Sequence, residues 1–65
     1  SIRIIVEITG VSYDEAKRIL KEANAVKTGI VMILADATKE AAEKALANAN
    51  GFVRKAIDDL KTSSS

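Results

Sequence analysis

The sequence predicts an all-α protein in which five short helices form two overlapping three-helix units that share the central helix. Three observations predict this fold. The composition is rich in alanine and contains no proline, which favours helices along the whole chain. Two stretches carry apolar residues at the i, i+3, i+4, i+7 spacing of a helix that packs with one face. The chain also matches itself when it is shifted by 26 residues.

The opening residues 2–9 are locally ambiguous, because their β-branched side chains would also suit a strand. Arg3 and Glu7 are four residues apart, as on one exposed face of a helix. Gly10 then supplies a natural helix stop. We therefore expect residues 2–9 to form the first helix.

Ser12 begins the clearest helix signal, which covers residues 12–24. Its hydroxyl can accept a hydrogen bond from the backbone N–H of Glu15, while the Glu15 carboxylate reaches back, as in a capping box. On the outer face, Arg18 can pair with the carboxylates that lie four residues before and after it.

Three more helices are expected, over residues 26–35, 38–50 and 52–61. The first of these is apolar on every side, which is typical of a helix in the middle of a structure. Gly29 inside it lowers helix propensity by about 1 kcal/mol relative to alanine. We therefore expect another helix to approach closely at Gly29.

An internal repeat explains the apolar central helix. The 26-residue shift aligns the helix caps, helix stops and apolar residues of the first unit with those of the second. The aligned pairs are Ser12 and Thr38, Ala16 and Ala42, Leu20 and Leu46, Ala23 and Ala49, Asn24 and Asn50, Val26 and Phe52 and, after one inserted residue, Gly29-Ile30 and Ala56-Ile57. The central helix closes the first unit and opens the second, so the units bury surface together. The domain covers residues 1–61, and we expect residues 62–65 to form a disordered polar tail. The alternative is coincidence among alanine-rich helices.

The composition excludes several kinds of site. The chain has no cysteine and no histidine, so the usual zinc ligands and a Ser-His-Asp or Cys-His pair are excluded. The net charge is +1, which gives no long-range attraction for nucleic acid or an anionic membrane. The longest apolar run, residues 29–35, is too short to span a bilayer. We expect no catalytic residue, no cofactor, no metal, and neither nucleic acid nor membrane as a partner.

Neighbouring carboxylates could perform acid–base chemistry only in a cleft that shifts their pKa values. Three groups occur in the sequence: Asp14/Glu15, Glu40/Glu43 and Asp58/Asp59. Because they fall at helix starts or on outer faces, we interpret them as solvated surface or as capping residues.

Part of the chain resembles the three-helix unit of ubiquitin-associated (UBA) domains. The resemblance is carried by residues 9–16 followed by residues 24–27. In that family a glycine-aromatic turn follows the first helix, and the corresponding turn here is Gly10-Val11. From the resemblance of residues 9–16 and 24–27 we expect the two units to be UBA-like. The candidate interaction surface consists of Gly10, Val11, Phe52, Arg54 and Lys55.

A second resemblance covers nearly the whole chain. Residues 4–12, 26–34 and 50–57 are similar to the C-terminal helical region of bacterial N-acetylmuramic acid 6-phosphate etherases. Its specific parts are the Val-Lys-x-x-Ile-Val-Met-x-Leu and Gly-Phe-Val-Arg-Lys-Ala strings. The resemblance implies a carbon–oxygen lyase, a cytoplasmic homodimer that cleaves the lactyl ether of its substrate during cell-wall recycling and releases D-lactate.

In that family, an N-terminal sugar-isomerase-type domain carries the sugar phosphate site and the acid–base carboxylates. No part of it occurs in this chain, so no catalytic residue is carried over. The resemblance implies a non-catalytic, cytoplasmic accessory domain whose partners are the catalytic domain and a second subunit. If the first helix is apolar on the side that meets the catalytic domain, it should expose an apolar patch there. The alternatives are a stand-alone UBA-like protein-binding module and a designed helical bundle.

Overall fold

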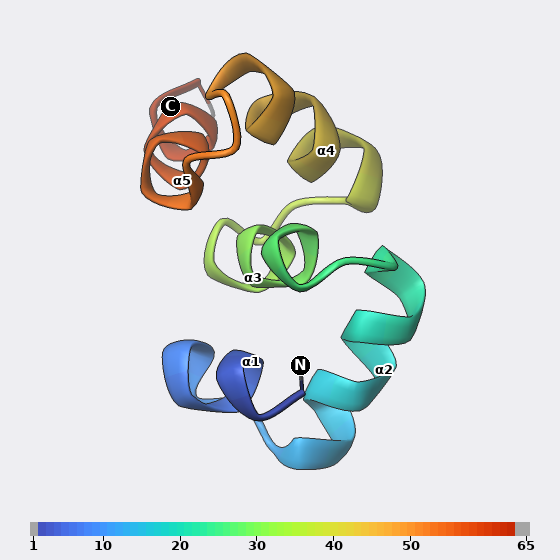
Figure 1. The fold of residues 1–65 in the computed structure, drawn as a ribbon. Coiled ribbons are helices and arrows are strands. Elements are labelled where there is room, and N and C mark those ends of the chain that lie inside the picture. Colours follow the sequence, from blue (N-terminus) through green and yellow to red (C-terminus); the bar gives the residue numbers. More distant parts are fainter. Residues whose placement is uncertain (1, 64–65) are drawn as a thin grey trace.

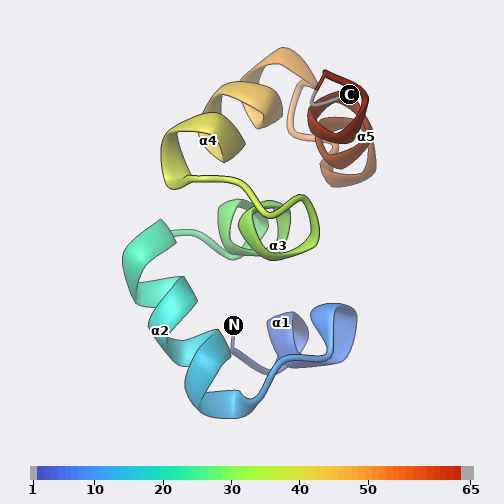
Figure 2. The same cartoon turned by 180° about the vertical axis from the view of Figure 1, so that it is seen from behind.

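The computed structural model describes residues 2–63 as a stack of helices with α3 in the middle. The five helices of this part of the chain are α1 (Ile2–Thr9), α2 (Tyr13–Ala23), α3 (Val26–Leu34), α4 (Lys39–Asn48) and α5 (Val53–Ser63). Figures 1 and 2 show α1 and α2 on one side of α3, and α4 and α5 on the other. The predicted all-α fold is confirmed, and the ambiguous residues 2–9 are helical.

The end of α5 corrects one prediction. The helix continues through Thr62 and Ser63, which were assigned to a disordered tail. Neither residue is a glycine or a proline, so nothing in the local sequence forces the helix to stop after Lys61. The remaining tail residues, 64–65, lie outside the described residues.

Side-chain caps determine where α2 and α4 begin. The Ser12 hydroxyl accepts a hydrogen bond of 3.1 Å from the Glu15 N–H, and the Thr38 hydroxyl accepts one of 3.1 Å from the Ala41 N–H. The Glu15 carboxylate, however, accepts a 2.7 Å hydrogen bond from Arg18, which therefore pairs three residues back rather than four. This bond raises the pKa of Arg18, which is charged at neutral pH in any case. Because the pair is exposed, it contributes little to stability.

Residues with positive φ end helices at equivalent points of the two units. Gly10 and Asp36, with φ of 80° and 53°, follow α1 and α3. Asn24 and Asn50, with φ of 64° and 56°, follow α2 and α4. The members of each pair are 26 residues apart, so the backbone conformation repeats together with the sequence.

Asp36→Gly should raise the free energy of unfolding by about 0.5–1 kcal/mol, because glycine adopts positive φ without the steric cost that a side chain carries. The Asp36 side chain is exposed, and glycine already occupies the equivalent position 10. Urea unfolding followed by circular dichroism measures the change. Asp36→Ala is the control and should lower stability. Equal stability of the two variants would contradict this account of the turn.

The core consists of two clusters that meet at α3. We define the first core as Ile5, Ala16 and Ile30. We define the second core as Ala23, Val31, Met32, Ala42, Ala45, Leu46, Ala49, Ala56 and Ile57. Five consecutive residues of α3, from Thr28 to Met32, are buried, and α3 contacts each of the other four helices. The central helix is thus shared by both units, as predicted.

Gly29 lies where α1 and α2 come close to α3. A Cβ atom at this position would be 3.2 Å from Cγ2 of Ile19 on α2, which is tighter than ordinary van der Waals contact. It would also lie 3.6 Å from Cδ1 of Ile5 and 3.8 Å from Cβ of Ala23. The close approach expected from a glycine inside an apolar helix is therefore present.

The repeat slips by one residue at Gly51. Because α3 begins at Val26 and α5 at Val53, these two residues are the equivalent pair, 27 positions apart. The sequence comparison paired Val26 with Phe52, which instead precedes the helix. The Lys27 ammonium donates a 3.2 Å hydrogen bond to the Gly51 carbonyl. This bond holds the turn with the extra residue against the start of α3.

Candidate interaction surfaces

The five residues predicted as an interaction surface lie in two places. Gly10 and Val11 connect α1 to α2, and half-buried Val11 packs against the first core. Phe52 directly precedes α5, and Arg54 and Lys55 lie in its first turn; all three are exposed, with Phe52 at 69%. Within residues 2–63, no hydrogen bond or ion pair joins the two groups. The second group therefore offers one exposed aromatic ring next to two cations.

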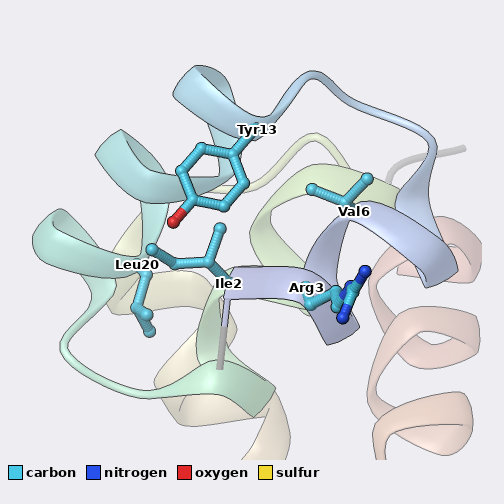
Figure 3. Close-up of a pocket in the computed structure, with 5 residues that line it drawn as sticks. All are labelled: Ile2, Arg3, Val6, Tyr13 and Leu20. Carbon is cyan, nitrogen blue, oxygen red and sulfur yellow. The ribbon is translucent and has the colours of Figure 1, made fainter.

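A groove of about 640 Å³ lies between α1 and α2 (Figure 3). We call it the α1–α2 groove, and it is lined by Ile2, Arg3, Val6, Tyr13 and Leu20. Arg3 and Tyr13 are exposed, and the three aliphatic residues are half-buried. In the view of Figure 3 the Tyr13 ring stands above Ile2 and Leu20, and Arg3 lies away from it along α1. The groove thus has apolar walls, one phenol and one cation.

The exposed apolar surface of α1 extends beyond the groove. Ile4 and Ile8 are 48% and 53% exposed, and their spacing of four residues places them on one face of the helix. Exposed apolar surface of this kind often marks a site of interaction. The first helix therefore exposes an apolar patch.

Sequence reasoning did not single out any of the five groove residues. Arg3 was placed on an exposed helix face and Leu20 in the repeated apolar pattern, and neither observation reveals which helix covers the residue. The signal that could have found the groove is the repeat, because Arg3 falls on Gly29 and Val6 on Met32. Both positions in the second unit belong to the helix that the sequence places in the middle.

A second groove, of about 350 Å³, lies between α4 and α5. It is lined by Ala41, Lys44, Ala45, Asn48, Asp59 and Leu60. Its lining is more polar in residue type than that of the α1–α2 groove, and it carries one cation and one carboxylate. Because it lies at the opposite end of the stack, this groove serves as a comparison surface for the α1–α2 groove.

The carboxylates considered for acid–base chemistry lie at the surface. All six are exposed except Glu15, which is half-buried and bonded to Arg18. Within residues 2–63, no three acidic, histidine or cysteine side chains lie together in a way that could hold a metal ion. None of the helices described here has the length and apolar character required to cross a membrane.

Together, these features define an all-α domain of two overlapping helical units with an apolar surface left open on its first helix. Neither a protein-family model nor a solved structure matches the chain. The predicted likeness of each unit to UBA domains therefore stays a prediction.

Three curated relatives show which proteins the chain resembles in sequence. It is 51% identical over 57 residues to the N-acetylmuramic acid 6-phosphate etherase of Geobacillus thermodenitrificans. It is 52% identical over 56 residues to the enzyme of that name from Exiguobacterium sp., and 50% identical over 58 residues to that of Listeria welshimeri. These matches cover 86%, 85% and 88% of this chain, but only 19%, 19% and 20% of the relatives.

The resemblance predicted from the sequence is thus confirmed, and the chain is homologous to the C-terminal part of N-acetylmuramic acid 6-phosphate etherases. It spans about a fifth of the length of these curated relatives.

Proposed function

We propose that the chain is a non-catalytic packing and interaction domain of an N-acetylmuramic acid 6-phosphate etherase. The observation that carries this proposal is sequence identity to an enzyme with that name. About half of the aligned residues are identical, and the alignment covers 86% of this chain and about a fifth of the enzyme. The catalytic part then belongs to the other four fifths of the polypeptide.

The distribution of polar groups supports a packing role. Thr28 is the one polar side chain among the buried residues of the described chain, and the buried hydrophobic residues are alanine, valine, isoleucine, leucine and Met32. The carboxylates are at the surface, in contact with water and outside any enclosed cleft. A general acid or base for ether cleavage would need a cleft that excludes water.

The partner in this proposal is the sugar-isomerase-type catalytic domain of the same polypeptide, together with a second subunit in a cytoplasmic dimer. Support comes from the exposed apolar side chains of α1, which a partner domain would cover. The alternative, a stand-alone UBA-like module, has no comparable support, since the relatives reported above are etherases.

The isolated chain should release no D-lactate from N-acetylmuramic acid 6-phosphate above the rate of a protein-free blank. A coupled D-lactate assay measures this, with the full-length G. thermodenitrificans etherase as the positive control. Sustained release by the purified chain would refute its assignment as non-catalytic.

The packing role needs a separate test in the whole enzyme. A chimera of the G. thermodenitrificans etherase that carries this chain in place of its matched segment should stay active and dimeric. Deletion of the segment should lower the melting temperature, dimerisation or kcat. A deletion enzyme with unchanged stability, assembly and kinetics would count against the proposal.

A further inference from the structure

We infer that the α1–α2 groove receives an amphipathic helix from the catalytic part of the etherase polypeptide, and that a carboxylate of this helix pairs with Arg3. The inference rests on the proposed function and deepens it, because it names the surface of the chain that meets the catalytic part and the chemistry of its occupant.

The first step is the repeat, which shows what covers an equivalent surface. The 26-residue shift pairs the groove residues with residues of the second unit: Ile2 with Thr28, Arg3 with Gly29, Val6 with Met32, Tyr13 with Lys39 and Leu20 with Leu46. Each residue of the second unit is more buried than its counterpart. Four of them are buried and Lys39 is half-buried, whereas in the groove three are half-buried and two are exposed.

The cause of this difference is the pair of helices that precedes α3. Ile19 and Ala23 of α2 lie 3.2 and 3.8 Å from the Cβ position of Gly29, and Ile5 of α1 lies 3.6 Å from it, so both helices cover α3 at this point. Ala23 also belongs to the same core cluster as Met32 and Leu46. The second unit is therefore closed by helices that precede it in the chain. Within residues 2–63, no helix precedes α1, and the equivalent surface stays open.

The geometry of this packing defines the occupant. On α2, the side chains that face α3 are four residues apart, so they form the apolar stripe of an amphipathic helix. A helix of the same kind fits along Ile2, Val6 and Leu20 of the groove. The exposed fraction of these three side chains would then fall.

Arg3 sets the charge of the occupant. It stands at the position where α3 has Gly29, so the incoming helix must lie farther out and accommodate a guanidinium group. Within the described residues Arg3 has no ion pair, whereas Arg18 is paired with Glu15. A carboxylate is the group that binds a guanidinium most strongly, through two parallel hydrogen bonds.

The source of the helix follows from the relatives. About four fifths of each curated relative lies outside the matched segment, and the matched segment belongs to the C-terminal part. The rest of that polypeptide is tethered to the segment, which gives it a high effective concentration at the groove. A free second copy of the chain has no such advantage.

The test uses the chimera of the G. thermodenitrificans etherase described above. Hydrogen exchange followed by mass spectrometry should show that the α1 amides exchange at least about tenfold more slowly in the chimera than in the isolated chain. Arg3→Glu should remove most of this protection. Lys44→Glu is the matched control, because Lys44 is exposed, lines the α4–α5 groove and undergoes the same change of charge.

Two further measurements keep the test decisive. The isolated Arg3→Glu chain should unfold at the same urea midpoint as the wild type, because Arg3 is exposed and has no ion pair within the described residues. A large drop in this midpoint would show that Arg3 acts within the domain and would overturn its pairing with the catalytic part. The unmodified G. thermodenitrificans etherase provides the same exchange comparison in the stretch aligned with α1, should the chimera not fold. Fast exchange in that stretch would overturn the inference.

The outcomes separate this inference from the proposed function. Protection confined to the α4–α5 groove, and lost with Lys44→Glu, would overturn the α1–α2 groove as the docking site but leave the accessory role standing. Protection of α1 that grows with protein concentration would identify a second subunit as the occupant and overturn the helix proposed here. Absence of protection anywhere, together with a normal deletion enzyme, would overturn both.

Discussion

Ile5→Ala should leave the chain largely unfolded at room temperature. Ile5 is 0% exposed and, with Val31, is one of the two largest fully buried side chains. Truncation of such a residue costs about 2–5 kcal/mol, through lost burial and the cavity that remains. A domain of this size rarely has more than about 3–5 kcal/mol of stability in total. Circular dichroism at 222 nm should therefore show a loss of most helical signal.

The neighbouring residue provides the matched control. Ile4 has the same side chain in the same helix but is 48% exposed. Ile4→Ala should change the free energy of unfolding by about 0.5 kcal/mol or less, since exposed positions contribute little to packing and alanine favours helix. Similar losses from both substitutions would mean that α1 does not pack with the Ile5 side inward.

Gly29→Leu should be the second most damaging change. A Cβ atom at this position would already lie 3.2 Å from Ile19, and leucine adds three more carbon atoms in the same direction. Forcing extra atoms into a packed core typically costs about 1–3 kcal/mol, which would consume much of the stability of this domain. Thermal unfolding should show a clear drop in the melting temperature.

The repeat supplies the control for this substitution as well. Arg3→Leu places the same side chain at the equivalent position of the first unit, where the surface is open. We expect it to leave the melting temperature of the isolated chain within a few degrees of the wild type. A Gly29→Leu variant as stable as Arg3→Leu would contradict the close approach of α2 to α3.

The helices could be predicted from the sequence because their ends are determined locally. Ser12 and Thr38 carry hydroxyl groups that cap a helix start, and Asn24 and Asn50 tolerate the positive φ that ends one. The central position of α3 followed from its apolar sides. In each case the information lies within a few residues of the feature, or in a simple pattern along one helix.

Other features could not be predicted, because they depend on choices that local patterns leave open. Glu15 had both its own helix start and Arg18 within reach, and sequence cannot rank two such weak contacts. The end of α5 carries no stop signal. The α1–α2 groove is open because, within residues 2–63, no further helix covers it, and the apolar pattern of one helix does not show which of its residues a neighbour covers.

The shared helix has a consequence for how the domain comes apart. Each unit needs α3 as one of its three walls, so neither can melt alone without exposing the buried side chains of α3 to water. Because α3 belongs to both units, five helices form two three-helix units, and the two halves unfold together. Denaturation should follow a single sigmoid with no plateau, and cleavage of the backbone between Val26 and Leu34 would leave two fragments that cannot fold separately.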